Sequence, residues 1–149
     1  MTVHRLAITM TAQKEAGMKK HPIIFVDDDA LYLRLVESIV VQAGIKAHYA
    51  TSGEDALEIL RGHHLELMVT DLNMRGMDGY ALSRQARKLI PGLRIILITG
   101  EVSPDISLLA ERAGISRVIG KPCEAGQIRE IISTAQPEAG TLHSVGAGH

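Results

Sequence analysis

The sequence contains little cysteine, few aromatic residues, almost no net charge and no long apolar run. Its one cysteine, Cys123, excludes an intramolecular disulfide and any metal site built from cysteines alone, so we expect a small packing residue there. A net charge of -1 and a single phenylalanine argue against a basic groove and an aromatic stacking surface, and we expect no nucleic-acid partner. The apolar runs are too short to form a transmembrane helix.

The N-terminal residues also lack the apolar core of a signal peptide, because charged residues soon interrupt their short apolar segment. We therefore expect a cytoplasmic protein that does not insert into membranes. With 149 residues, of which 46% are apolar and 22% charged, the chain has the composition of one soluble globular domain. Residues 1–20 and 137–149 lack sustained periodicity, so we interpret them as tails around a domain at residues 21–136.

Short apolar segments alternate with helical patterns throughout this domain. Strands are expected at residues 22–27, 46–50, 65–70, 93–99 and 115–119. The first helix should begin at Asp29 and end at Gly44, with one apolar stripe made of Leu31, Leu35, Ile39 and Ala43. The other helices are marked by Ala56, Leu57, Ile59 and Leu60; by Leu82, Ala86 and Leu89; by the segment from Ser103 to Ala113; and by Ile128, Ile131, Ile132 and Ala135.

Five strands that alternate with five helices through short connections predict a doubly wound α/β domain with a parallel sheet between two helical layers. In such sheets ligands bind at the carboxyl ends of the strands. These ends carry Asp27 and Asp28, then Asp71, Thr99 and Lys121, which should converge on one rim.

The segment FVDDD places three carboxylates, Asp27, Asp28 and Asp29, at consecutive positions where they repel one another, so a positive partner is expected nearby. The strand-end residues form an acidic cage for a hard cation such as Mg2+, together with donors for an anionic group. The cation and the ammonium group of Lys121 would supply the positive charge. A carboxylate in such a site can act as the nucleophile of phosphoryl transfer.

Four motifs occur in order on the expected strand ends: FVDDD (25–29), VTDLNMRGMDG (69–79), LITG (97–100) and GKP (120–122). With them the sequence resembles the receiver domains of bacterial two-component response regulators, the chemotaxis receiver being the nearest type. The resemblance covers roughly residues 21–136. It implies a flavodoxin-like receiver fold with strand order 2-1-3-4-5.

The resemblance implies that Asp71 accepts a phosphoryl group from a phosphohistidine of a sensor histidine kinase or a histidine phosphotransfer protein. It further implies that Mg2+ is bound by Asp28, Asp71 and the backbone carbonyl of Asn73, with Asp27 acting through water. Lys121 would contact a phosphoryl oxygen and would be joined to Pro122 by a cis peptide bond.

By the same resemblance, Thr99 would bind another phosphoryl oxygen and so trigger the conformational switch. Asn73 and Glu101 would influence how fast the acyl phosphate hydrolyses. Two residues depart from the family pattern. Val118 stands where an aromatic residue is usual, so the signal is expected to use backbone shifts or another surface. Arg75 replaces the usual proline and is expected either to loosen its loop or to reach toward an acidic group of a partner.

We therefore expect a stand-alone receiver that is a signalling phosphoacceptor, catalysing only its own phosphorylation and dephosphorylation. It would signal by binding a downstream target protein or by passing the phosphoryl group onward. One alternative is a phosphorylation-independent adaptor, which Val118 favours. The other is a haloacid dehalogenase-type phosphatase with Asp27 as nucleophile and Asp29 as acid/base, although the later acidic pair of that class has no counterpart at a strand end.

Overall fold

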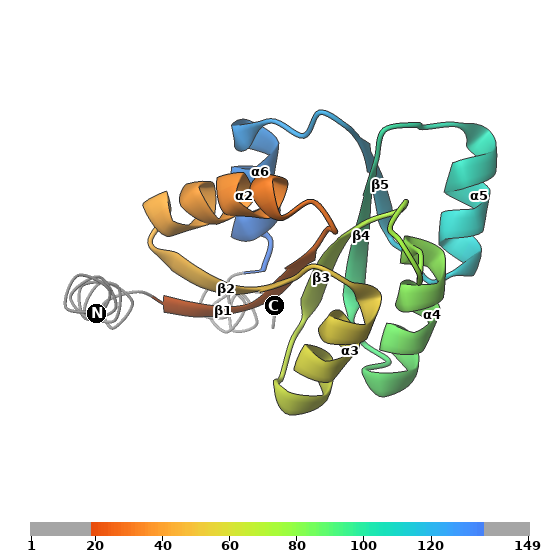
Figure 1. The fold of residues 1–149 in the computed structure, drawn as a ribbon, viewed down its shortest axis with the longest axis horizontal. Coiled ribbons are helices and arrows are strands. Elements are labelled where there is room, and N and C mark those ends of the chain that lie inside the picture. The colour runs from red at the N-terminus through yellow and green to blue at the C-terminus, as the bar shows by residue number, and fades with distance from the viewer. Residues whose placement is uncertain (1–18, 136–149) are drawn as a thin grey trace, which may run out of the picture.

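The computed structural model describes residues 19–135, which contain five strands and five helices (Figure 1). The strands are β1 (Lys19–Val26), β2 (Ile45–Ala50), β3 (Leu67–Asp71), β4 (Arg94–Thr99) and β5 (Arg117–Gly120). The helices are α2 (Ala30–Gln42), α3 (Gly53–Gly62), α4 (Gly79–Leu89), α5 (Pro104–Arg112) and α6 (Ala125–Ser133). Strands and helices alternate along the chain, as the sequence pattern predicts.

All strand pairs are parallel, and their order across the sheet is β2-β1-β3-β4-β5. β1 lies at the centre of the switch in strand order: its Phe25 pairs with Tyr49 of β2 on one side and with Val69 of β3 on the other. The predicted doubly wound fold and its strand order are confirmed. The crevice outside the carboxyl ends of β1 and β3 is where this topology places a ligand site.

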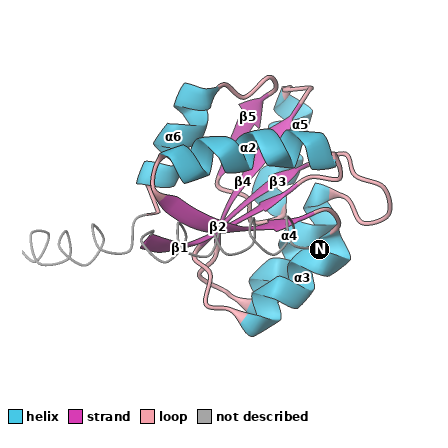
Figure 2. Ribbon diagram, turned by 60° about the vertical axis from the view of Figure 1, so that its left-hand side comes forward, coloured by secondary structure: helices cyan, strands magenta, loops and turns pink. Residues whose placement is uncertain are grey.

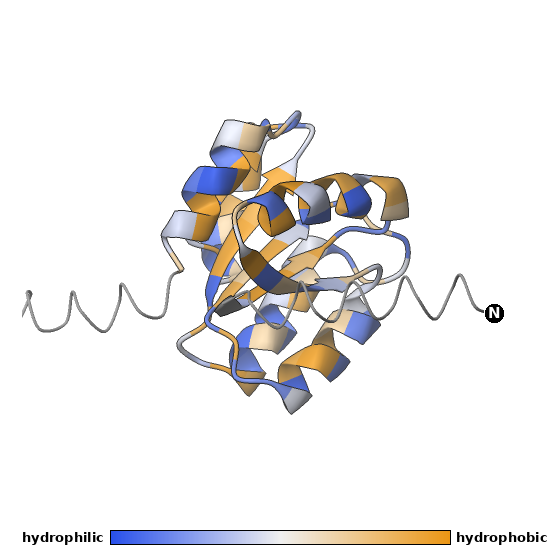
Figure 3. Ribbon diagram, turned by 90° about the vertical axis from the view of Figure 1, so that its left-hand side faces the viewer, coloured by the Kyte–Doolittle hydropathy of each residue, from blue (hydrophilic) through white to orange (hydrophobic). Residues whose placement is uncertain are grey.

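Successive residues of the strands point to opposite faces of the sheet, and each face has its own apolar core. Ile24 and Val26 of β1 belong to the core under α3, α4 and α5, whereas Ile23 and Phe25 belong to the core under α2 and α6. Figure 2 shows the two helical layers on either side of the strands. In Figure 3 the strands carry mostly hydrophobic colours, as expected for a sheet that is buried on both faces.

Side-chain hydrogen bonds cap the first turns of α2, α3 and α5. Asp29 Oδ1 accepts hydrogen bonds from the backbone N–H groups of Leu31 and Tyr32, at 3.0 and 3.2 Å. The hydroxyl groups of Ser52 and Ser103 cap α3 and α5 in the same way. These bonds satisfy backbone donors that have no partner inside the helix.

The predicted apolar stripe of α2 is wrong. Its buried residues are Leu33, Val36, Ile39 and Val40, whereas Leu31 and Leu35 are 75% and 58% exposed. A strict four-residue spacing drifts around a helix of 3.6 residues per turn, so positions 31 and 35 do not remain on the face that Ile39 buries. The pattern of three- and four-residue steps that starts at Leu33 stays on one face.

The boundaries of the domain also need correction. β1 already begins at Lys19, so the predicted tail at 1–20 includes the start of a strand. Residues 1–18 and 137–149 of the predicted tails lie outside the described residues. β5 begins at Arg117, two residues after the predicted start at residue 115. None of the helices in residues 19–135 has the length and apolar character needed to cross a bilayer.

Candidate functional site

The predicted strand-end residues meet at one edge of the sheet. Asp27 and Asp28 follow β1, Asp71 and Thr99 are the last residues of β3 and β4, and Lys121 follows β5. Asp27, Asp71 and Thr99 are buried, although their side chains are polar. Three acidic residues, one hydroxyl and one ammonium group therefore share a site that much of the bulk water does not reach.

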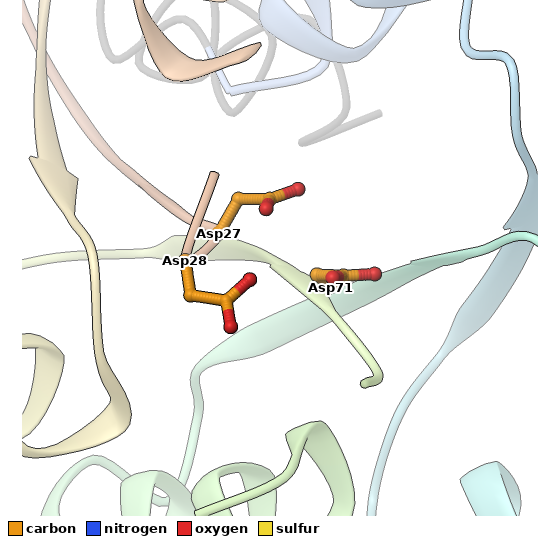
Figure 4. A group of neighbouring side chains, drawn as sticks. All are labelled: Asp27, Asp28 and Asp71. Atoms are coloured by element: carbon orange, nitrogen blue, oxygen red, sulfur yellow. The ribbon is translucent and has the colours of Figure 1, made fainter. Parts of the chain in front are cut away.

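Asp27, Asp28 and Asp71 each offer a carboxylate oxygen, and these oxygens lie within 4.8 Å of one another (Figure 4). The neighbours Asp27 and Asp28 come from the chain beyond β1, and Asp71 comes from β3 beside it. Carboxylate oxygens are hard ligands, and a small set of them suits Mg2+, which keeps several of its own waters. The donor set therefore fits the magnesium ion that the sequence predicts.

Lys121 compensates the acidic cluster from one side. Its Nζ lies 3.1 Å from Asp71 Oδ1 and 3.3 Å from Asp27 Oδ2. Burial by itself would lower the pKa of Lys121, but the carboxylates of Asp27 and Asp71 outweigh it and hold the pKa above its ordinary value. The side chain is thus a firmly charged ammonium. The predicted cis peptide bond between Lys121 and Pro122 is present.

Asp71 has a second contact besides Lys121. Its Oδ1 also accepts a hydrogen bond of 3.0 Å from the backbone N–H of Leu72. Burial and then repulsion by Asp27 raise the pKa of Asp71, and the opposing effect of Lys121 and the Leu72 N–H group is smaller. A second positive charge in the site, such as a divalent cation, would favour the ionised form.

Asp28 has a different partner. Its Oδ2 accepts a hydrogen bond of 3.0 Å from the backbone N–H of Arg75 and lies 3.5 Å from Nε of the same arginine. This contact within the chain was not predicted: the sequence led us to expect that Arg75 loosens its loop or reaches toward an acidic group of a partner. The contact joins two loops at the carboxyl ends of β1 and β3, and no spacing in the sequence indicates it.

The remaining predicted residues lie around this cluster. The hydroxyl oxygen of Thr99 accepts the backbone N–H of Glu101 at 3.3 Å, and its carbonyl accepts the backbone N–H of Lys121 at 2.7 Å. Asn73 and Glu101 are exposed. Val118 is half-buried and packs against the core under α3, α4 and α5. The hydroxyl of Thr99 is therefore bonded within the loop after β4, its carbonyl joins the ends of β4 and β5, and position 118 carries no aromatic ring.

Tyr32 is a residue of the site that the sequence reasoning missed. Lys121 Nζ lies 5.4 Å from the centroid of its ring, within the range of a cation–π interaction. Its hydroxyl is buried and has no hydrogen-bond partner among the described residues. Burial, followed by smaller effects of nearby anionic groups, raises the pKa of Tyr32 to about 12. Tyr32 lies in the first turn of α2, just after Asp29, and this position could have indicated from the sequence that it lies at the same edge of the sheet.

Asp29 does not take part in the cluster. Its carboxylate is exposed and caps α2 through two backbone N–H groups. The phosphatase alternative places its acid/base on this carboxylate, whose Oδ1 already accepts both capping bonds. Asp29 therefore caps a helix, whereas the clustered carboxylate oxygens belong to Asp27, Asp28 and Asp71.

Comparison with known proteins identifies relatives over most of the domain. A family model described as the response regulator receiver domain matches residues 23–133. The transcriptional regulatory protein GlrR of Escherichia coli K12 is 28% identical over 113 residues, which are 76% of this chain and 26% of that protein. The sensor histidine kinase RcsC of the same strain is 28% identical over 111 residues, 74% of this chain and 12% of that protein. The chain thus spans only a small part of these relatives.

Solved structures agree. A receiver domain protein described as CheY-like, from Methanospirillum hungatei JF-1, has a TM-score of 0.71 at 28% identity and covers 78% of this chain and 92% of its own. The chemotaxis protein CheY4 of Vibrio cholerae has a TM-score of 0.72 at 21% identity, with coverage of 80% and 99%. At that identity the second likeness concerns the fold alone.

Proposed function

This chain belongs to the response regulator receiver family, and from that premise we propose that it accepts a phosphoryl group on Asp71 in a two-component or phosphorelay pathway. Receiver domains are signalling phosphoacceptors, which is the coarse function that the family assigns. The observation that carries the finer proposal is the position of Asp71, at the end of β3 with Lys121 Nζ at 3.1 Å and two further carboxylates beside it.

In the proposed reaction a carboxylate oxygen of Asp71 attacks the phosphorus of a phosphohistidine on a partner. The new O–P bond forms as the P–N bond breaks, and the leaving imidazole takes up a proton. Lys121 neutralises a phosphoryl oxygen, and Thr99 can turn its hydroxyl from the N–H of Glu101 toward another. Burial of Asp71 and Thr99 limits the access of water to the acyl phosphate.

Asp28, Asp71 and the backbone carbonyl of Asn73 would hold Mg2+, and Asp27 would act through water. When bound, the ion supplies positive charge that the carboxylates and the entering phosphoryl oxygens share. Asn73 and Glu101 are exposed beside the site, which supports an influence of both residues on hydrolysis of the acyl phosphate. The protein would catalyse only its own phosphorylation and dephosphorylation.

The proposed partners are a sensor histidine kinase or a histidine phosphotransfer protein before the site, and a downstream protein after it. One relative is itself named a sensor histidine kinase, which supports a pairing with that class. A cytoplasmic location follows from such partners. Because Val118 offers no ring, we propose that the output depends on the loop after Thr99 and on backbone movement of β5.

The experiment that tests this function combines acetyl phosphate, Mg2+ and intact-mass measurement on the wild type, Asp71→Asn and Asp27→Asn. The wild type should gain the mass of one phosphoryl group, and Asp71→Asn should gain none. A phosphorylated Asp71→Asn protein would instead favour Asp27 as the nucleophile. A phosphotransfer profile against histidine kinases, with tryptic mapping of Asp71, then tests the partner class.

A phosphorylation-independent adaptor is the second candidate, and Val118 is the observation that favours it. Pull-down experiments with the wild type and Asp71→Asn distinguish the two functions. An adaptor captures the same proteins with both forms. A phosphoacceptor that signals by binding captures its target more strongly after treatment of the wild type with acetyl phosphate.

A further inference from the structure

Two basic residues divide the acidic cluster between them. Lys121 contacts Asp27 and Asp71, at 3.3 and 3.1 Å. Among the ion pairs of residues 19–135, Asp28 is paired by Arg75, whose Nε lies 3.5 Å from Asp28 Oδ2. Three carboxylates therefore face two cations, and each cation serves different acidic residues.

The contact of Arg75 falls on the carboxylate of Asp28, which is one of the three groups that would hold a metal ion. Asp28 Oδ2 accepts the backbone N–H of Arg75 at 3.0 Å and lies 3.5 Å from Nε of the same residue, so one carboxylate oxygen faces both the backbone and the guanidinium of Arg75. Asp28 belongs to the group of oxygens that lie within 4.8 Å of one another. A cation bound to these oxygens and the guanidinium of Arg75 both interact with the carboxylate of Asp28, and the two positive groups repel each other.

The two side chains of this ion pair differ in exposure. The side chain of Arg75 is 89% exposed, whereas that of Asp28 is 24% exposed. A long exposed side chain gains rotamer freedom when it leaves its partner, so the pair is easily broken from the side of the arginine. Arg75 can therefore move into solvent while Asp28 remains where β1 and Asp27 hold it.

We propose that Arg75 is a tethered cation that competes with the divalent cation for Asp28 and so sets the affinity of the site for Mg2+. This inference rests on the proposed function, because it assumes that Asp28 ligates the ion. Without metal, the guanidinium offsets the charge of Asp28. When the ion binds, the guanidinium leaves Asp28, and this exchange weakens the apparent affinity.

The expected size of the effect follows from the exposure of the pair. Exposed ion pairs contribute little, and the corresponding change in the dissociation constant of Mg2+ is about two- to fivefold. Arg75→Ala and Arg75→Gln should both tighten Mg2+ binding by this factor. Arg61→Ala is the matched control, since Arg61 is exposed in the last turn of α3, at the opposite edge of the sheet.

The test is a Mg2+ titration of the full chain, followed by backbone amide NMR signals, with the four proteins at low and at high ionic strength. The difference between Arg75→Ala and the wild type should shrink as salt screens the pair. The Nε–H signal of Arg75, assigned by its loss in both Arg75 variants, should shift in the wild type with the same midpoint as the amides of the acidic site.

The possible results separate this inference from the proposed function. Equal Mg2+ affinity in the wild type and both Arg75 variants overturns the competition and leaves phosphorylation of Asp71 untouched. An Arg75 Nε–H signal that does not respond to Mg2+ also overturns it, because the guanidinium then stays in place. Absence of Mg2+ binding in all four proteins overturns both the competition and the proposed metal site, and the mass measurement then decides whether Asp71 is phosphorylated.

Discussion

The ammonium group of Lys121 lies 3.1 Å from the carboxylate of Asp71 and brings the ends of β5 and β3 together across the intervening strand β4. Such a pair attracts strongly only because the site is partly shielded from water. The same ammonium group also contacts Asp27, so two carboxylates share its positive charge. We therefore expect Lys121 to stabilise the metal-free protein.

Lys121→Met should destabilise the metal-free protein by about 1–2 kcal/mol, since it leaves buried carboxylates without their cation and the partial exposure of Lys121 reduces the full cost. Mg2+ should restore part of the loss, because the ion supplies the missing positive charge. Urea denaturation with a chelator and with Mg2+ measures both effects. Lys88→Met, at an exposed position of α4, serves as the control. An equal response of the two variants would contradict the compensating part of Lys121.

Asp71 should make the metal-free protein less stable as the pH rises. Its pKa is raised above the ordinary value of 3.8, so the folded state binds the proton more tightly than the unfolded state. The stabilisation from this proton is fully present below 3.8 and is lost as the pH rises through the higher folded pKa. Asp71→Asn lacks this titration, so its stability relative to the wild type should increase across the same window.

Denaturation curves of the wild type and Asp71→Asn at several pH values, in the presence of a chelator, measure this difference. Other acidic groups titrate in both proteins and largely cancel. A constant difference between the two proteins over the whole window would show that the folded pKa of Asp71 is not raised. Addition of Mg2+ to the wild type should reduce the difference, because a bound cation favours the ionised carboxylate.

Tyr32→Phe should leave the stability unchanged or raise it by up to about 1 kcal/mol, because the lost hydroxyl is buried and has no partner among the described residues. The ring that faces Lys121 remains in this variant. Tyr80→Phe is a suitable comparison, since the Tyr80 hydroxyl lies 3.4 Å from the carbonyl of Ile106 and its removal should cost little. Urea denaturation measures both. A clear loss of stability in Tyr32→Phe would show that the Tyr32 hydroxyl forms a hydrogen bond in solution and would contradict this prediction.

Residues of the site could be predicted from the sequence where the chain topology alone determines their position. Asp27, Asp71, Thr99 and Lys121 all follow or end apolar strands, and the carboxyl ends of parallel strands meet at one edge. The roles in phosphoryl transfer came from the family resemblance, and topology by itself supported only a site for a cation and an anion. The metal ligands and the phosphorylation of Asp71 stay predictions.

Other features depend on side-chain directions that periodicity does not set. The contact of Arg75 with Asp28 joins two loops, and the position of Tyr32 beside Lys121 depends on the angle at which α2 leaves the sheet. The exposed face of α2 was predicted wrongly for a related reason. Leu31 and Leu35 are as apolar as Leu33 and Val36, so composition alone could not identify the buried face.

Val118 allows a last prediction about the position where an aromatic residue is usual in the family. A groove of about 480 Å³ runs between α5 and β5 and is lined in part by Val102, Ser107 and Val118. A larger side chain at position 118 can extend into this groove instead of into the core. Val118→Tyr should therefore change the free energy of unfolding by less than about 1 kcal/mol.

The adjacent Ile119 provides the matched control. It points to the other face of β5, is buried under α2 and α6, and belongs to a closely packed core. Ile119→Tyr should lose about 1–3 kcal/mol or more, because the ring has no space and its hydroxyl no partner. Urea denaturation of the two variants measures the contrast. Equal losses would mean that the groove closes around Val118 in solution and leaves no room for a ring at this position.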